Sequence, residues 1–331
     1  MRAIQFDTAG AAKDVLTDVT IEPTQPAPGE VLVKVAYSAV NPTDVKRRGS
    51  GRELPNFSPI IPGNDGAGVI EAVGEGVDPA CVGDNVWIFG AQAGRPDGTT
   101  AEYCTLPHWM APPLPDGVSL EHGACLGVPA VTAYHGIFSD GLVDGMTVLV
   151  SGGAGRVGSY AVQMAKLGGA TVIATAGTDE NTAYAKSLGA DHVINYKTED
   201  VAARVLEITD GHGVDRACEV AFGANINLFA EICANNAVVT TYSSDANDTP
   251  TMPFLQLMFK NITIRPFSIY ALPETVKWDA FMAINDMLAS GSISHRIGKK
   301  CPFTLDGVVA AHEAIETDAV TGVCLIEVSP A

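Results

Sequence analysis

The sequence predicts an α/β protein with two domains, one rich in β-strands and one with a doubly wound parallel sheet. Three observations support this prediction. The chain has 331 residues, which is long for a single domain. Short strand-like stretches fill about the first 125 residues, and strand and helix patterns alternate regularly over residues 127–266. We therefore assign residues 1–125 and 267–331 to the first domain and residues 126–266 to the second.

The first domain is expected to be mostly β-structure. Apolar and polar residues alternate in its expected strands, and prolines and glycines separate them. Ser119 precedes a short expected helix as its N-cap. Residues 323–328 have strand character, and we expect them to return and pair with the first domain. The other strands are expected at residues 1–6, 31–37, 67–73 and 85–89.

The second domain is expected to alternate strands and helices, which predicts parallel strands joined by right-handed crossovers. Its strands are expected at residues 148–150, 171–176, 192–195, 214–219, 237–241 and 262–265. Helical patterns lie between them at residues 160–167, 180–188, 200–209, 226–234 and 254–260. A further helix is expected from residue 275 to residue 290.

A glycine-rich motif joins the first strand of this domain to its first helix. Gly153, Gly155 and Gly158 fit the spacing G-x-G-x-x-G directly after the strand. In such a motif the first glycine permits a tight turn, the second lets the backbone approach a pyrophosphate, and the third lets the helix pack on the strand. The helix N-terminus then favours phosphate binding. The candidate cofactor-binding residues here are Gly153, Ala154, Gly155, Arg156, Val157 and Gly158, although Arg156 could also point to solvent.

Charge and cysteine content narrow the function classes. A formal net charge of -18 argues against nucleic-acid and membrane partners, because the surface would repel phosphates. No apolar run approaches the length of a membrane span, and the N-terminus has strand character, so we expect a cytoplasmic protein. The seven cysteines are scattered without a C-x-x-C pair, which predicts buried free thiols in a reducing compartment.

Several motifs resemble the quinone oxidoreductase (zeta-crystallin-like) branch of the medium-chain dehydrogenase/reductases. The resemblance implies a GroES-like β-rich catalytic domain, a Rossmann domain that binds a dinucleotide, and the C-terminal return. The matching segments are Asn41-Pro-Thr-Asp44, residues 62–74, 83–86 and 101–103, and residues 127–134.

The chain departs from the zinc alcohol dehydrogenases of the same superfamily. Those enzymes carry Cys-His-x-Asp and Gly-His-Glu where this chain has Asn41-Pro-Thr-Asp44 and Gly63-Asn64-Asp65. One carboxylate, Asp65, cannot replace the Cys and His ligands of a catalytic zinc, so we predict no metal site.

A protein without a metal Lewis acid is expected to reduce acceptors that conjugation already activates. The resemblance implies that it does so with NADPH. Quinones and activated alkenes fit, with direct hydride transfer from nicotinamide C4. One alternative is a 2-alkenal or enone reductase with little quinone activity. Another is a non-catalytic, crystallin-like NADPH-binding protein with a structural or RNA-binding role, although the charge argues against RNA.

The resemblance also supplies candidate catalytic residues, Asn41 and Lys46. The position of Asn41 implies contact with nicotinamide and substrate, and its amide could donate to the acceptor oxygen, but Asn before Pro also makes ordinary turns. Lys46 could orient a polar acceptor or donate a proton, but the run Lys46-Arg47-Arg48 could equally be a solvated basic edge. Asp44 and Asp65 could relay protons or cap backbone.

Cofactor choice depends on the end of the second strand, where NAD enzymes carry an acidic residue. This chain has Ala176-Gly177-Thr178 there, which favours NADP(H). Asn181 stands where some relatives have the lysine that grips the 2′-phosphate, and Asp179 and Glu180 are acidic, so the grip could be weak. Further cofactor contacts are expected at Gly177 and Thr178, and the resemblance implies others at Asn181, Tyr196 and Thr132. Ser243 and Ser244 follow the fifth strand at the carboxyl edge of the sheet, where nicotinamide contacts are expected.

The expected partners are a small quinone or enone and a second copy of the chain. The segment from Ile262 to Phe267 resembles the edge strand through which family members pair their sheets. We therefore expect a homodimer through this edge.

Overall fold

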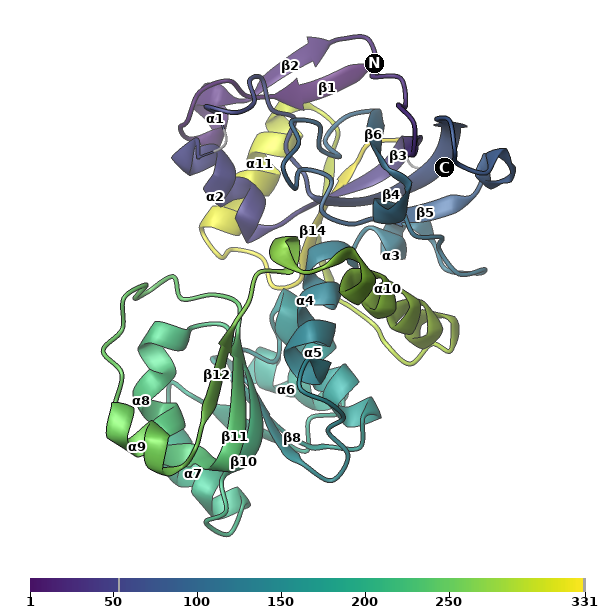
Figure 1. Ribbon diagram of the computed structural model, residues 1–331. Coiled ribbons are helices and arrows are strands. Elements are labelled where there is room, and N and C mark those ends of the chain that lie inside the picture. Colours follow the sequence, from purple (N-terminus) through teal and green to yellow (C-terminus); the bar gives the residue numbers. More distant parts are fainter. Residues whose placement is uncertain (53, 330–331) are drawn as a thin grey trace. The chain divides into compact units, whose positions relative to one another are not determined.

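The computed structural model describes residues 1–52 and 54–329. The chain divides into two compact units (Figure 1). The first unit comprises residues 1–128, 281–289 and 295–331, and the second comprises residues 129–280 and 290–294. Among the described residues, no helix is long and apolar enough to cross a membrane.

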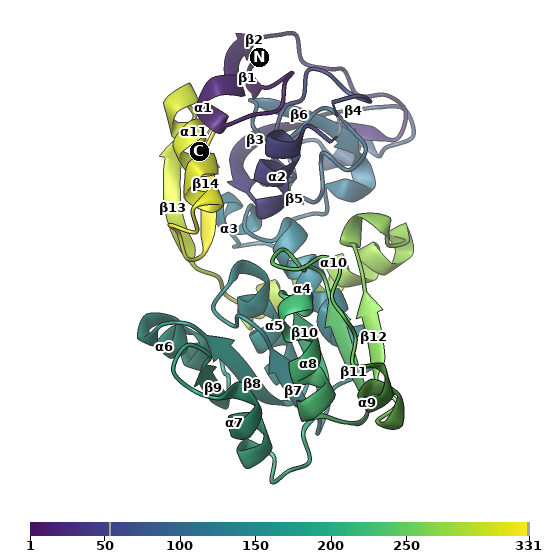
Figure 2. The ribbon, with the colours of Figure 1, turned by 90° about the vertical axis from the view of Figure 1, so that its left-hand side faces the viewer.

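The first unit is built on a mostly antiparallel sheet in the order β13-β14-β3-β4-β5, with β6 also paired to β3. The C-terminal strand β14 pairs with β3, as expected from its sequence. Helix α11 packs on β13 and β14 (Figure 2). The strands are β1 (Arg2–Gln5), β2 (Thr17–Thr20), β3 (Glu30–Val40), β4 (Asp65–Val73), β5 (Asn85–Ile88), β6 (Tyr103–Pro107), β13 (Ile297–Pro302) and β14 (Val323–Glu327). The helices are α1 (Ala12–Val15), α2 (Pro42–Ser50), α3 (Leu120–Gly123) and α11 (Leu305–Glu316).

The second unit contains a six-stranded parallel sheet in the order β12-β11-β10-β7-β8-β9, which confirms the predicted doubly wound domain. The strands are β7 (Thr147–Val150), β8 (Thr171–Ala176), β9 (His192–Asn195), β10 (Val214–Glu219), β11 (Cys233–Thr241) and β12 (Thr263–Pro266). The helices are α5 (Arg156–Leu167), α6 (Asp179–Ser187), α7 (Val201–Ile208), α8 (Phe222–Ile232) and α9 (Phe254–Phe259). Two helices, α4 (Gly127–Phe138) and α10 (Glu274–Ala289), have residues in both units.

The strand order reverses between β7 and β10. Chain connections leave these two neighbouring strands in opposite directions, so a crevice is expected outside their carboxyl ends. Helices α7 and α8 share an apolar core with one face of the sheet, including Leu149, Ile173 and Ala217. This packing holds the two strands that flank the reversal.

The basic run after Asn41 is not a uniformly solvated edge. Lys46 is exposed, but Arg48 is completely buried. Arg48 donates to the carbonyl of Gly10, forms an ion pair with Glu316, and its Nε lies 3.4 Å from His312 Nδ1. A carbonyl and a carboxylate partner compensate the buried guanidinium, so Arg48 joins α2 to α11.

Candidate functional site

The glycine-rich turn lies at the carboxyl end of β7, beside the reversal of strand order. The left-handed residue of the turn is Gly152, with φ of 66°, whereas the sequence predicted that Gly153 permits the turn. A Cβ on Gly153 would instead lie 2.7 Å from the Cβ of Ala174, and one on Gly158 would lie 2.1 Å from the Gly152 carbonyl oxygen. These two glycines therefore permit close packing, and Gly152, outside the G-x-G-x-x-G spacing, permits the turn.

Gly155 differs from its neighbours because its outer side is open. It is exposed, its φ is −73°, and a Cβ there would meet only the Gly152 oxygen, at 3.2 Å. Helix α5 starts at the next residue, Arg156, and the first N–H groups of a helix have no partners within it. The turn thus offers backbone donors, the positive end of a helix and no obstructing side chain, which fits a pyrophosphate.

The other predicted residues of this motif lie around the same turn. Ala154 is buried, whereas Arg156 and Val157 are half-buried in the first turn of α5.

The ends of β8 and β9 form the part of the site where cofactor choice is expected. Ala176 is buried, and a Cβ on Gly177 would lie 2.5 Å from the Tyr196 hydroxyl oxygen and 3.2 Å from Lys197 Cε. Tyr196 and Lys197 therefore lie beside the Gly177 backbone, and both are exposed. Lys197 was not predicted from the sequence, because an exposed lysine in a loop gives no signal of its own.

Two predicted residues at this point have a local structural role. Thr178 is the N-cap of α6, and its hydroxyl accepts from the backbone N–H of Asn181 at 3.2 Å. Cofactor contact by either side chain has to be compatible with this cap.

A hollow of about 550 Å³ lies at the carboxyl ends of β11 and β12, and the predicted residues Ser243 and Ser244 line it. The Ser244 hydroxyl accepts from the Gly223 N–H at 2.8 Å and donates to the Asn247 carbonyl. Thr132, predicted to contact the nicotinamide-side ribose, is buried in α4 of the same unit. The remaining lining residues are Phe222, Thr241, Tyr242, Asp248, Pro250, Pro266, Phe267 and Ser268.

The predicted catalytic residue Asn41 belongs to a buried polar network in the first unit. Asn41 is the N-cap of α2, and its backbone N–H donates to Asp44 Oδ2 at 2.7 Å. Its side-chain Nδ2 donates to Asp65 Oδ2 at 2.6 Å. Asp44 Oδ1 accepts from the backbone N–H and the Nδ2 of Asn64, at 3.2 and 2.5 Å. All four side chains are at most 2% exposed.

The two carboxyl groups of this network are costly to ionise. Burial raises the pKa of Asp44 to about 6. Burial and the neighbouring Asp44 raise the pKa of Asp65 to about 8, and the N–H groups of Val128 and Asn41 offset only part of the shift. Asp65 is therefore largely protonated at neutral pH, whereas Asp44 is largely ionised.

The family positions of zinc ligands hold amides in this network. Asn41 and Asn64 bond to the two carboxyl groups, and no group of three or more His, Cys, Asp or Glu side chains that could hold a metal occurs among residues 1–52 and 54–329. An amide is a poor substitute for thiolate or imidazole at zinc.

Lys46, the other predicted catalytic residue, lies on α2. It is exposed, whereas Asn41 and Asp44 are buried.

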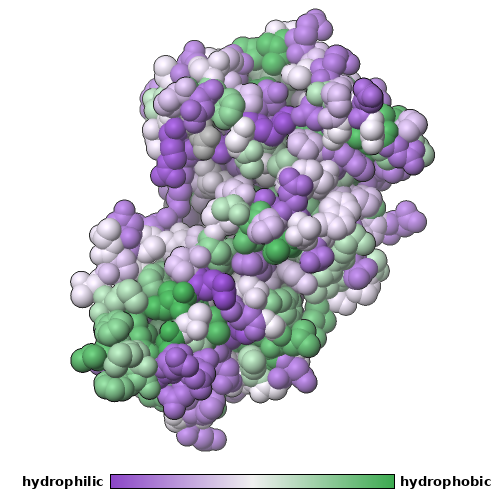
Figure 3. All heavy atoms as spheres, in the orientation of Figure 1, coloured by the Kyte–Doolittle hydropathy of each residue, from purple (hydrophilic) through white to green (hydrophobic). Residues whose placement is uncertain are grey.

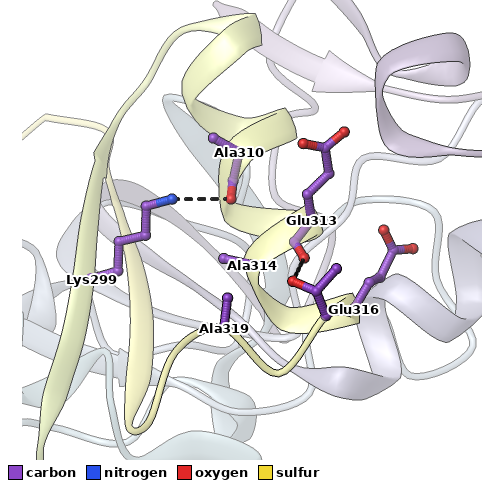
Figure 4. Close-up of a pocket in the computed structure, with 7 residues that line it drawn as sticks. Lys299, Ala310, Glu313, Ala314, Glu316 and Ala319 are labelled. Carbon is purple, nitrogen blue, oxygen red and sulfur yellow. Dashed lines mark hydrogen bonds between the residues drawn. The ribbon is translucent and has the colours of Figure 1, made fainter.

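A second hollow, of about 480 Å³, lies beside α11 and contains none of the predicted site residues (Figure 4). Lys299 Nζ donates there to the Ala310 carbonyl at 3.3 Å, and Glu316 is the ion-pair partner of Arg48. The hollow is lined by residues of α11 and of the segment after it, and by Lys299 of β13.

Comparisons with known proteins find a matching family for a segment of each of the two expected domains. Residues 27–116 match the alcohol dehydrogenase GroES-like domain, and residues 157–285 match the zinc-binding dehydrogenase domain. A chloroplast envelope quinone oxidoreductase homolog of Arabidopsis thaliana is 30% identical, with 92% of each chain covered. A 2-methylene-furan-3-one reductase of Solanum lycopersicum is 30% identical, with 91% of this chain and 72% of the relative covered. The crystal structure of Escherichia coli quinone oxidoreductase complexed with NADPH superposes with a TM-score of 0.85 at 25% identity, covering 99% of this chain and 100% of the other.

Proposed function

The chain belongs to the quinone oxidoreductase branch of the medium-chain dehydrogenase/reductases, and we propose that it reduces quinones or activated alkenes with NADPH and without a metal. The observation that carries the proposal is the open turn at Gly155, whose donors and helix N-terminus fit a pyrophosphate. Bound NADPH supplies a hydride from nicotinamide C4 to the activated acceptor. The NADPH complex of the E. coli relative supports this cofactor.

The protein's own task is to bind, orient and stabilise charge. The backbone at Gly155 and the start of α5 would hold the pyrophosphate, and Thr132, Ser243 and Ser244 would contact the nicotinamide half. Asn41 has two N–H donors on Nδ2, and Asp65 accepts from that nitrogen. We propose that the second donor stabilises the oxyanion that develops on the acceptor.

The experiment that tests this proposal follows oxidation of NADPH and NADH with a small quinone and with an α,β-unsaturated ketone. We expect turnover with NADPH that survives a strong chelator, and metal analysis that finds no stoichiometric zinc. Turnover with only the ketone would favour the enone reductase alternative, which the tomato relative supports. NADPH binding without turnover on either acceptor would favour a non-catalytic role, and a zinc-dependent rate would contradict the metal-free proposal.

We propose that Tyr196 and Lys197 select NADPH at the ends of β8 and β9. The 2′-phosphate is expected beside Gly177, where the Lys197 side chain lies. No hydrogen bond or ion pair to another described residue engages the Lys197 ammonium, so it is available to an anion. The Lys197 ammonium would take the place of the lysine that some relatives carry at the position of Asn181.

Replacing Lys197 by glutamine is expected to raise the Kd for NADPH about tenfold, because a charge-assisted contact of about 1.5 kcal/mol or more is lost. The Kd for NADH should change little, and equilibrium binding of 2′,5′-ADP and 5′-AMP measures the same selectivity without turnover. Lys186→Gln, on the exposed surface of α6, is the matched control. Equal losses for both nucleotides would place phosphate recognition elsewhere.

The expected homodimer through β12 remains a proposal that two features support. Strand β12 is the edge of the parallel sheet, and the neighbouring helix α9 exposes Phe254, Leu255 and Phe259 by 65%, 61% and 78%. Figure 3 shows hydrophobic side chains gathered on this part of the surface. Such a patch beside an unpaired strand edge suits a second copy of the chain.

Light scattering should report a dimer for the wild type, and Phe259→Glu together with Leu255→Glu should shift the mass toward a monomer. A wild-type monomer at the same concentration would refute the dimer.

The free cysteines of the described residues support the cytoplasmic location that we propose.

A further inference from the structure

Glu219 is a buried carboxylate at the carboxyl end of β10, next to the reversal of strand order, and it was predicted only as a strand residue. Its side chain is completely buried. One carboxylate oxygen, Oε2, accepts from the Ser151 hydroxyl. The other, Oε1, accepts from the backbone N–H of Ala221 and from Asn225 Nδ2, the latter at 3.1 Å.

No cation within residues 1–52 and 54–329 forms an ion pair with Glu219. The titratable groups close enough to feel the charge of Glu219 are Cys218 and Tyr242, and burial keeps both neutral by raising their pKa values. Only neutral dipoles therefore solvate this carboxyl group. A polar group with this desolvation penalty is expected to have a specific role, because an apolar residue would cost less at a merely structural position.

On one side, Glu219 holds the glycine-rich turn. Ser151 directly precedes Gly152, the left-handed residue of the turn. The Gly152 carbonyl accepts from the Gly155 N–H at 2.8 Å and lies against Gly158, as the 2.1 Å approach of a Cβ there shows. Fixing the Ser151 side chain therefore fixes the peptide on which the pyrophosphate-binding turn and the start of α5 depend.

On the other side, Glu219 holds the start of α8, which in turn holds the loop after β11. Ala221 is the N-cap of α8. The next two backbone N–H groups, of Phe222 and Gly223, donate to the Ser243 carbonyl at 3.2 Å and to the Ser244 hydroxyl at 2.8 Å. Ser243 and Ser244 line the hollow at the end of the sheet.

We propose that Glu219 is a positioning residue that locks the pyrophosphate-binding turn to the loop of Ser243 and Ser244, so that both halves of the cofactor site keep one arrangement. The inference rests on the proposed function, because it takes dinucleotide binding as given. Glu219 acts through Ser151 and α8 and does not itself touch the cofactor.

The chemistry of the contacts separates two substitutions. In Glu219→Gln, the amide oxygen can accept from Ala221 and Asn225, while the NH₂ group donates to the Ser151 oxygen, so every contact is kept. In Glu219→Leu, the volume is kept but the donors of Ser151, Ala221 and Asn225 lose their acceptor.

The test measures the Kd for NADPH at equilibrium and splits kcat from KM. Glu219→Leu is expected to raise the Kd and the KM for NADPH at least about tenfold with kcat nearly unchanged, whereas Glu219→Gln stays within about threefold of wild type. Phe229→Leu, a buried core residue of α8, is the control for general loss of stability and should leave the Kd unchanged.

If Glu219→Leu does not fold, Ser151→Ala decides the question, since it removes a single hydroxyl and should raise the Kd about threefold or more. An unchanged Kd in a folded Glu219→Leu or in Ser151→Ala would overturn the inference and leave the proposed function intact. Absence of NADPH binding in the wild type would instead refute the proposed function itself.

Discussion

Replacing Gly155 by valine is expected to raise the Kd for NADPH at least about a hundredfold while the protein stays folded. The backbone of Gly155 has φ of −73°, which any residue adopts, and a Cβ there meets only one atom, at 3.2 Å. The valine methyl groups would instead occupy the open side of the turn, where the pyrophosphate has to approach the start of α5. Loss of two charge-assisted contacts, at about 1.5 kcal/mol or more each, accounts for the hundredfold effect.

The measurement is equilibrium binding of NADPH together with a thermal melt. Gly158→Ala serves as the contrasting variant, because its Cβ would lie 2.1 Å from the Gly152 carbonyl oxygen and the backbone would have to move. That variant should melt at a lower temperature, whereas Gly155→Val should melt close to wild type. NADPH affinity that is unchanged in a folded Gly155→Val would remove the glycine turn as the cofactor site.

The sequence predicted the fold class and the strands of the second domain well, because the apolar patterns of that domain reflect burial directly. It did not predict β2, β6 and β13 of the first unit. Strand β8 occupies residues 171–176, as expected. Helix α5 begins at Arg156, at the helix N-terminus expected for the glycine-rich motif. Helical spacing is visible in the sequence only from residue 160, because Gly158 and Ser159 in the first turn are weak helix formers. Four glycines lie within residues 152–158, and their spacing in the sequence does not indicate which of them has a positive φ.

The side-chain arrangement of the site was less predictable, because it depends on pairing between distant segments. The antiparallel register pairs Ala39 with Asp65, and this pairing brings Asn41, two residues further on, beside that carboxyl group. Nothing local to either segment predicts the contact. Glu219 and Lys197 were missed for related reasons, since one follows a strand pattern and the other stands in an exposed loop.

The buried network predicts an unusual dependence of stability on pH. Asp65 has a pKa of about 8 in the folded protein, whereas an unfolded aspartate titrates near 3.8. Between these values the folded state binds a proton that the unfolded state has lost. The free energy of unfolding should therefore fall as the pH rises, by up to about 1.4 kcal/mol per pH unit for this group. Asp44 contributes in the same direction only up to about pH 6.

Buried histidines act in the opposite direction at lower pH. Burial lowers the pKa of His312 to about 3 and that of His295 to about 4, so the unfolded state binds more protons than the folded state below about pH 6.5. Their contribution makes stability rise with pH in that range. Above about pH 6.5 the contribution of the histidines to this pH dependence disappears. Between there and pH 8 the free energy of unfolding should fall with rising pH because of Asp65.

Asp65→Asn is expected to abolish the fall in stability between about pH 6.5 and pH 8, because an amide cannot ionise and its oxygen can still accept from Asn41 and Val128. Urea unfolding at several pH values measures the slope for each variant. Asp84→Asn, an exposed carboxylate of the same unit, is the matched control and should keep the wild-type slope. The same slope in wild type and Asp65→Asn would mean that Asp65 is ionised in the folded protein at neutral pH. The network would then have to hold two buried negative charges on the donors of Asn41, Asn64, Val128 and Gly90, and Asn41 would be oriented by an ionised partner instead of a neutral one.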